Sequence, residues 1–194
     1  MKKLLTVLLA ALLLCGLSGC KDASTRIQNT DDGKLCIDEQ RAIDFYLGND
    51  EEGADPITAQ CLAIIGDREP DSIETNLCAV DFNGPEDFFE IYIVNGVKIT
   101  LLHYGEEPHR HTVLWTVDLD ENHSLASGIG IGSTEEELKH AYNGKTEFYF
   151  EDHYGDDDTK YYVLYGAWYE RYPIVFEVDT DTGIITDISY DLDV

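Results

Sequence analysis

The sequence predicts an α+β fold in which short helices pack on an antiparallel sheet, with a helix-then-strands unit that occurs twice. Three observations indicate this class. Apolar and polar residues alternate with period two in several segments, as where Val113, Trp115 and Val117 fall on one face. The dipeptide Asn95-Gly96 separates two such segments and is typical of a β-hairpin. A helical pattern then reappears at Ser133, ahead of a second set of alternating segments.

The first predicted unit spans residues 35–125. A short helix is expected at residues 38–47. A second is expected at residues 56–65, because Pro56 suits the first turn of a helix and Gly66 suits its end. The strands that follow are expected at residues 73–82, 88–94, 97–104 and 112–119.

The second predicted unit spans residues 126–194. Ser133 and Glu136 have the spacing of a capping box, which predicts a helix that runs to about Tyr142 and ends at Asn143-Gly144. The strands that follow are expected at residues 146–152, 160–165, 172–178 and 184–190.

The N-terminus is typical of a secretory signal. Lys2 and Lys3 precede an apolar run that ends near Gly16, well short of the roughly 20 residues needed to span a bilayer. The next four residues, Leu17-Ser18-Gly19-Cys20, resemble the lipobox of bacterial lipoproteins. The resemblance implies that residues 1–19 are cleaved, that Cys20 carries the lipid that holds the chain on a membrane, and that residues 20–34 form a lipidated tether.

The residue after the lipobox indicates the membrane to which the protein is sorted. Lys21 stands where an Asp retains many Gram-negative lipoproteins in the inner membrane. The resemblance therefore implies an outer membrane location, on the periplasmic face or the cell surface, in a Gram-negative cell.

The net charge of the mature chain restricts the classes of molecule that it can bind. The formal net charge is −26, and removal of residues 1–19 takes away Lys2 and Lys3 and no acid, which leaves −28. Such a balance repels nucleic acid and anionic lipid. It suits basic protein partners, loosely held cations, or simply a solvated surface.

Three cysteines remain after the lipid site, in a compartment that permits disulfides. They are Cys36, Cys61 and Cys78, so one bridge and one thiol are expected. The sequence does not select the pair. Cys61 lies in an apolar helical segment, which favours Cys36 with Cys78. No CxxC motif occurs, so neither a redox motif nor a zinc knuckle is indicated.

A glycine-rich run carries a second resemblance. The segment from Gly128 to Leu138, followed by Tyr142 and Gly144, resembles the start of a repeat in one superfamily of tandem α+β domains. That superfamily includes the β-lactamase inhibitor protein and the small lipoprotein of the outer-membrane barrel-assembly machine. Its repeats open with Gly-apolar-x-Gly-x-Ser/Thr and continue through an acidic helix into antiparallel strands. The resemblance covers residues 128–190.

The strand part of the resemblance rests on Tyr161-Tyr162 and on residues 176–185. Residues 55–120 fit only in part, since no opening glycine pair occurs there. Membership implies a binding or assembly scaffold without catalytic residues.

The alternating glycines at 128, 130 and 132 would leave one side of a strand bare, which permits close backbone approach or a bulge. They do not predict a nucleotide site. Glu135 stands where the last glycine of a dinucleotide fingerprint belongs, and no βαβ unit surrounds the run.

Other chemistry finds little support. His109 and His111 would point the same way in a strand, near His103, but such a metal site needs further ligands. The segment Asp118–Asn122 begins like a calcium loop and lacks its Gly and Glu. No Gly-x-Ser-x-Gly elbow occurs. The sequence predicts no enzyme, no metal and no cofactor.

Aromatic residues are concentrated near the C-terminus. Of 21 aromatic residues, 12 lie between Phe148 and Tyr190, more than one sheet can cover with one short helix. Such rings, edged with acids, are typical of a protein-binding face, although tyrosine is also ordinary in strands. The candidate partner-binding residues are Tyr161, Tyr162, Tyr165, Trp168, Tyr169 and Tyr172.

These observations favour a non-catalytic, lipid-anchored cell-envelope protein that binds another protein or supports assembly. The alternative is an inhibitor whose aromatic face blocks a secreted or periplasmic enzyme. A third hypothesis is a sensor of a small ligand or cation that uses the His and Asp turns.

Overall fold

The computed structural model describes residues 26–29, 31–47, 56–67, 70–77, 87–144, 148–151, 159–166 and 169–191. Its centre is an eight-stranded antiparallel sheet with the order β4-β5-β6-β7-β12-β11-β10-β9. The strands are β4 (Ser72–Leu77), β5 (Phe88–Val94), β6 (Val97–Tyr104), β7 (His111–Asp118), β9 (Phe148–Glu151), β10 (Thr159–Gly166), β11 (Tyr169–Asp179) and β12 (Ile185–Asp191). Together with two α-helices, this confirms the α+β class.

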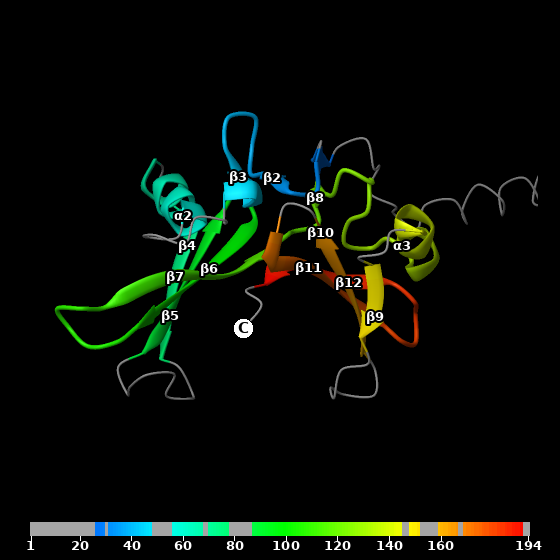
Figure 1. Ribbon diagram of the computed structural model, residues 1–194. Coiled ribbons are helices and arrows are strands. Elements are labelled where there is room, and N and C mark those ends of the chain that lie inside the picture. Colours follow the sequence, from blue (N-terminus) through cyan, green and yellow to red (C-terminus); the bar gives the residue numbers. More distant parts are fainter. Residues whose placement is uncertain are drawn as a thin grey trace, which may run out of the picture.

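The helices and the two small sheets lie on one side of the large sheet (Figure 1). Helix α2 (Pro56–Asp67) precedes strands β4 to β7, and α3 (Glu135–Tyr142) precedes β9 to β12. The side that carries α2 and α3 is called the helix side below, and the opposite side is called the open face.

The predicted helix at residues 38–47 is wrong. Its place is taken by a hairpin of β2 (Lys34–Cys36) and β3 (Ala42–Asp44), followed by the 3-10 turn η2 (Phe45–Leu47). The cause is local, because Asp38 Oδ1 accepts hydrogen bonds from the backbone N–H groups of Gln40 and Arg41 and so forms a turn.

Helix α3 begins one residue later than its predicted start. Thr134 is the N-cap: its Oγ1 accepts from Glu137 N at 3.2 Å, and the Glu137 carboxylate accepts from Thr134 N at 2.8 Å. The Ser133 hydroxyl instead accepts from Gly130 N at 3.1 Å. Helix α2 also differs from its prediction, since it runs through Gly66 to Asp67.

The glycine run at residues 128–132 forms a loop and not a strand. The close approach expected there is confirmed. A Cβ on Gly130 would lie 2.9 Å from the backbone oxygen of His123 and would overlap the Arg26 guanidinium. Only glycine fits this position without a shift of the chain.

The predicted tether is too long. Strand β1 (Ile27–Gln28) pairs in parallel with β8 (His123–Ser124). Asp32 is 7% exposed; its carboxylate accepts from Ala126 N at 2.8 Å and from the Tyr142 hydroxyl at 3.2 Å. Residues 26–29 and 31–34 are therefore part of the folded unit, and only the chain before Arg26 remains for a tether.

The two halves of the sheet meet along a short junction. Strands β7 and β12 pair only at Asp118 with Ser189, Val117 with Tyr190, and Thr116 with Asp191. A bulge follows at Trp115, since Thr116 pairs with Thr100 while Leu114 pairs with Leu101.

Next to that bulge, the backbone N–H and carbonyl of Leu114 form hydrogen bonds with side chains outside the β6–β7 pairing. Leu114 N donates to Thr58 Oγ1 of α2 at 2.8 Å, and the Leu114 oxygen accepts from the Tyr172 hydroxyl at 3.0 Å. The bulge therefore fixes α2 to β7 and brings β11 against the junction from the helix side.

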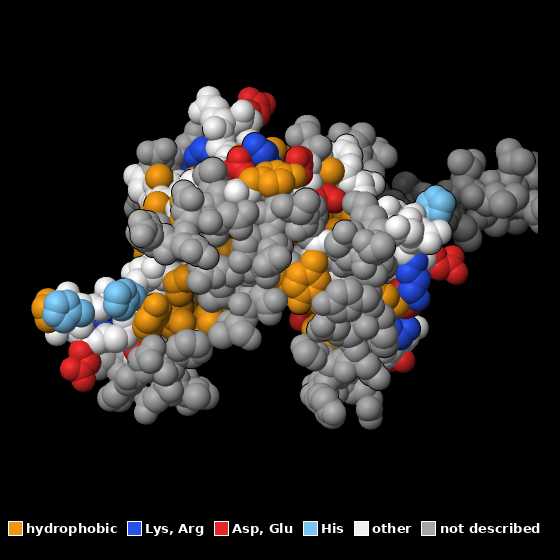
Figure 2. All heavy atoms as spheres, in the orientation of Figure 1, with side chains coloured by type: hydrophobic (Ala, Val, Ile, Leu, Met, Phe, Trp, Pro, Cys, Tyr) orange, Lys and Arg blue, Asp and Glu red, His pale blue; other side chains and the backbone are white. Residues whose placement is uncertain are grey.

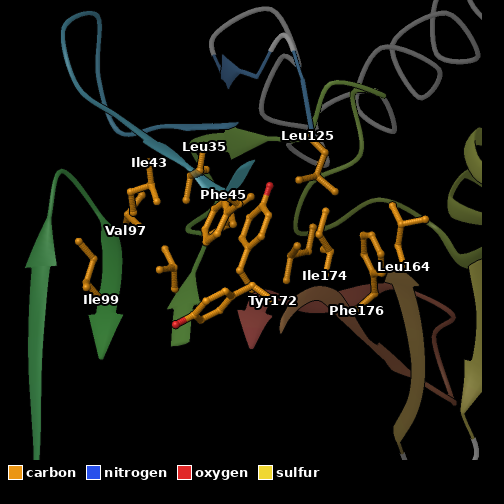
Figure 3. Close-up of a cluster of buried hydrophobic side chains, with 14 of the residues drawn as sticks. Leu35, Ile43, Phe45, Val97, Ile99, Leu125, Leu164, Tyr172, Ile174 and Phe176 are labelled. Atoms are coloured by element: carbon orange, nitrogen blue, oxygen red, sulfur yellow. The ribbon is translucent and has the colours of Figure 1, made fainter. Parts of the chain in front are cut away.

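The β2–β3 hairpin completes the core over this junction (Figure 3). Leu35 and Ile43 are fully buried, and the Phe45 ring stacks on Tyr190 with centroids 4.1 Å apart. Tyr172 lies 5.8 Å from the same ring. The N-terminal segment thus contributes to the part of the core that lies over both halves of the sheet.

Candidate functional site: the open face of the sheet

Cross-strand pairing identifies the residues of the open face. Directly paired residues in an antiparallel sheet point to the same side. Because Ile99, Val117, Tyr190 and Ile174 belong to the core, their chain neighbours point away from it. One row across the open face consists of Ile93, Lys98, Asp118, Ser189, Val175 and Val163.

The first half contributes an apolar patch, defined as Phe89, Ile91, Leu102, Val113 and Trp115. Leu102 pairs with Phe89 on one side and with Val113 on the other. It is 1% exposed although it lies outside the core of the helix side. The centroids of the Phe89 and Trp115 rings on the same face are 5.6 Å apart. The other four residues of the patch are half-buried.

The patch corrects the expected buried face of this strand. Val113 and Trp115 were expected to share that face with Val117, but the bulge at Trp115 shifts the alternation. Leu114 and Val117 enter the core, while Val113 and Trp115 lie on the open face. A bulge adds one residue to a strand and so exchanges its two faces.

The junction contributes charge. The seam carboxylates, defined as Asp118, Glu177, Asp187 and Asp191, surround one lysine, Lys98. Lys98 Nζ lies 2.6 Å from Asp118 Oδ2, and the Asp118 side chain is 11% exposed. The lysine also acts electrostatically on the other three carboxylates.

Burial sets the electrostatics of this group. The pKa of Asp187, Asp191 and Glu177 is raised in each case first by loss of hydration, while Lys98 lowers it. Asp187 adds a like charge beside both Asp191 and Glu177. The seam carboxylates are therefore acids whose negative charges are incompletely compensated.

The predicted tyrosines are divided between the two faces. Tyr161 pairs with Glu177 on the open face and is half-buried, as is Tyr165 beside a bulge. Tyr162, 5% exposed, points to the helix side, where its hydroxyl donates to Glu135. Tyr172 is fully buried. Trp168 lies outside the described residues, as does the side chain of Tyr169.

Tyr162 and Tyr172 are therefore removed from the set of candidate partner-binding residues, because both are buried. Adjacent residues in a strand point to opposite sides, so Tyr161 and Tyr162 cannot share a face. Tyr172 is an internal hydrogen-bond donor to Leu114. The residues that sequence reasoning missed are Phe89 and the seam carboxylates. The alternation of residues 88–94 carries a signal for Phe89. The carboxylates come together through two strand pairings, since β11–β12 joins Glu177 to Asp187 and β7–β12 adds Asp118.

On the helix side, Glu135 joins α3 to β10. Its carboxylate lies 2.7 Å from Lys139 Nζ and 3.2 Å from Lys160 Nζ. Hydrogen bonds from Lys139 and then from Tyr162 lower the pKa of Glu135 to about 2. This cluster explains the burial of Tyr162 as a structural contact.

A polar chain crosses β5, β6 and β7 on the helix side. The Tyr92 hydroxyl donates to Glu90 at 2.7 Å, Glu90 lies 3.0 Å from His103 Nε2, and His103 Nδ1 lies 2.9 Å from Thr112 Oγ1. Burial raises the pKa of Tyr92 to about 12. Phe88 stacks on the imidazole at 4.7 Å. The chain links neighbouring strands, and we assign it a structural role.

Histidines gather at the tip of the β6–β7 arm (Figure 2). His103 pairs with Thr112 and Tyr104 with His111, so His103 and His111 point to opposite sides of the sheet. Within the described residues, no three His, Cys, Asp or Glu side chains are placed to hold a metal ion. Asp120, in the middle of the calcium-like segment, accepts a hydrogen bond from Asn122 N at 2.9 Å within its own turn.

The cysteines are described in part. Cys36 is half-buried in β2 and Cys61 is fully buried in α2. Cys78, the expected partner of Cys36, and Cys20, the expected lipid site, lie outside the described residues. Among the helices that are described, none is long and apolar enough to cross a membrane.

Comparison of the chain with protein-family models, with curated proteins and with solved structures gives no match. In the described residues, the architecture is that of an α+β protein in which helices and two small sheets lie over one face of a large antiparallel sheet. Its function must be inferred from its own surfaces.

Proposed function

We propose that the chain is a non-catalytic, lipid-anchored protein of the bacterial cell envelope that binds another protein through the open face. The anchor rests on the sequence Leu17-Ser18-Gly19-Cys20 after a signal-like segment. With Lys21 next, the outer membrane is the proposed address in a Gram-negative cell.

The observation that carries the binding role is the composition of the open face. Phe89 and Trp115 form an apolar patch on one side of the seam carboxylates, and Tyr161 lies on the other. Half-buried aromatic rings next to incompletely compensated charge are typical of contact surfaces between proteins.

Charge indicates the kind of partner. Three seam carboxylates have a raised pKa, so an added cation would stabilise their ionised form. The formal net charge of −26 acts in the same direction at long range. The partner is therefore a protein that presents a Lys or Arg flanked by apolar side chains.

We also propose that the two halves derive from one duplicated helix-then-strands unit. In the described residues, each half contains one α-helix followed by four antiparallel strands of the large sheet, and the two four-stranded sets meet through their last strands, β7 and β12. This order agrees with the repeat architecture implied by the resemblance of residues 128–190.

The test uses the mature lipoprotein purified from its native host. Mass spectrometry should find a diacylated N-terminal Cys20, and the Cys20→Ser variant should be lost from the membrane fraction. An uncut leader or an unacylated N-terminus would refute the anchor.

The binding role is tested by cross-linking in intact envelopes, with Phe89→Ala/Trp115→Ala compared with Leu62→Ala. Leu62 is 44% exposed on α2, on the other side of the sheet, and is the matched control. We expect the wild type and the control to be cross-linked to the same partner in equal yield. In the double variant, the yield of this cross-linked complex should fall at least tenfold. Equal capture by all three would refute the open face as the binding surface.

The inhibitor alternative remains a special case of the same proposal. The seam carboxylates could occupy a basic active-site cleft, so the isolated partner should be assayed for enzymatic activity with and without the chain. Loss of activity would identify an inhibitor, and unchanged activity would favour an assembly role.

A further inference from the structure

The position at which the chain enters the folded unit is fixed by Arg26. Arg26 Nη2 donates to the Ile131 oxygen at 2.7 Å, and the guanidinium lies over Gly130. The next residues form β1, which pairs with β8. The entry point therefore lies beside the loop that precedes α3, on the helix side and away from the open face (Figure 1).

The chain before this point is short. Cys20 and Arg26 are six residues apart in the sequence. A fully extended chain of that length spans at most about 22 Å. If Cys20 is held in a bilayer, Arg26 and the loop beside it cannot move farther than this from the lipid surface.

The loop beside the entry point differs in chemistry from the rest of the chain. We call residues 126–133 the entry loop. Residues 124–134 contain no Asp, Glu, Lys or Arg, in a chain whose formal net charge is −26. Ser127, Gly128 and Gly132 are exposed, while Ile129 and Gly130 are buried and hold the loop in place. Loss of hydration costs an uncharged polar surface far less than a charged one, so this loop can approach lipid headgroups more readily than a charged surface can.

We propose that the entry loop rests on the headgroups of a zwitterionic membrane, so that the open face is directed away from the bilayer and toward its partner. This inference rests on the proposed lipid anchor. It adds an orientation, because the short tether and the uncharged loop lie on the same side of the sheet.

The neighbouring charges restrict the lipid. Glu136 and Glu137 follow the entry loop and are exposed, whereas the Arg26 guanidinium is half-buried and is hydrogen-bonded to the Ile131 oxygen. The exposed charge next to the loop is thus acidic, and like charge repels anionic headgroups. The contact should therefore be closest on phosphatidylcholine vesicles and should weaken when a third of the lipid is phosphatidylglycerol.

The experiment compares two tryptophan reporters in the full lipidated protein, on phosphatidylcholine vesicles that carry nitroxide-headgroup lipid. The open-face reporter is Trp115 in a Trp168→Phe background. The entry-loop reporter is Ile131→Trp in a Trp115→Phe/Trp168→Phe background. Gln28→Trp, at an exposed site in β1, is a second entry-side reporter if Ile131→Trp does not fold by circular dichroism.

We expect at least threefold stronger quenching of the entry-loop reporter than of Trp115. Insertion of about 30 Gly/Ser residues after Lys21, which adds about 30 Å of root-mean-square reach, should bring the two values together. Equal quenching with the native tether, stronger quenching of Trp115, or a ratio unchanged by the insertion would each overturn the orientation. Failure of the lipid anchor would be recognised separately in a flotation assay, because unacylated protein would not float with the vesicles.

Discussion

The two sides of the β7–β12 junction are built in opposite ways from the same three residue pairs. On the helix side, Val117 and Tyr190 are fully buried, and Phe45 stacks on Tyr190. On the open face, Asp118 and Asp191 flank Ser189, with Lys98 as their cation. Apolar packing therefore holds the junction from one side, while the other side concentrates charge.

The difference shows where the stability of the junction originates. Three residue pairs between β7 and β12 are a narrow connection for two four-stranded halves. The N-terminal segment reinforces it, because Phe45 packs on Tyr190 and Asp32 binds the loop before α3 and α3 itself. The open face can then depart from optimal stability, which is common at sites of function.

The largest effect is expected on the helix side. Tyr190→Ala should lower the free energy of unfolding by about 3–5 kcal/mol, because it leaves a cavity under Phe45 between the two halves. Tyr190→Phe is the control: it keeps the stacked ring and removes only the hydrogen bond to the Asp32 oxygen, at a cost of about 1 kcal/mol. Urea denaturation measures both. A loss below 1 kcal/mol in Tyr190→Ala would show that the junction does not depend on this packing.

The next effect is expected where the N-terminal segment meets the second half. Asp32→Ala should cost about 2–3 kcal/mol, since Ala126 N and the Tyr142 hydroxyl lose an acceptor in a buried site. Asp32→Asn keeps one acceptor oxygen and should cost less than half as much. Thermal unfolding by circular dichroism compares the two variants. Equal losses would indicate that the carboxylate charge, and not hydrogen bonding, is what matters.

A smaller effect is expected on the open face. Lys98→Met removes the cation beside Asp118, whose side chain is 11% exposed, and should cost about 1–2 kcal/mol at neutral pH. The loss should shrink in acid, because the raised pKa values of Asp187, Asp191 and Glu177 favour their protonation there, which leaves less negative charge for Lys98 to balance. Denaturant midpoints at pH 7 and pH 4 test this. A loss that does not change with pH would assign the effect to packing of the lysine stem.

Much of this fold follows from local pattern. The period-two segments at residues 88–94 and 97–104 predict β5 and β6 with their bounds, and Asn95-Gly96 predicts the turn between them. The β2–β3 hairpin was missed because its strands are short and its turn depends on the Asp38 side chain. The bulge at Trp115 was missed because one inserted residue becomes visible only in the register with β6.

The candidate site was predictable only in part. Period two does separate Tyr161 from Tyr162, but it does not say which of them faces the core. That choice depends on Glu135, which binds Tyr162 from a different element. Asp118 reaches Lys98 through the β6–β7 hairpin, but the other three seam carboxylates are distant in sequence, and the pairing of β7 with β12 brings them to Lys98.

The smallest expected effect has the opposite sign and compares the two sides of the junction most directly. Burial raises the pKa of Asp187 above its ordinary value, so the folded state binds this proton more tightly than the unfolded state does. Its contribution to stability is present below about pH 4 and is lost as the pH rises through the folded-state pKa. Asp187→Asn should therefore stabilise the protein at pH 7, by up to about 1 kcal/mol, and should have no effect at pH 3.

The same substitution should give a larger gain in the Lys98→Met background, because Lys98 lowers the pKa of Asp187 and thus reduces the cost of its charge. A double-mutant cycle of chemical denaturation at pH 7 and pH 3 measures this coupling. Destabilisation by Asp187→Asn at pH 7, or a gain independent of both pH and Lys98, would mean that the open face is as well compensated as the helix side. The seam carboxylates would then have no unmet charge with which to attract a basic partner.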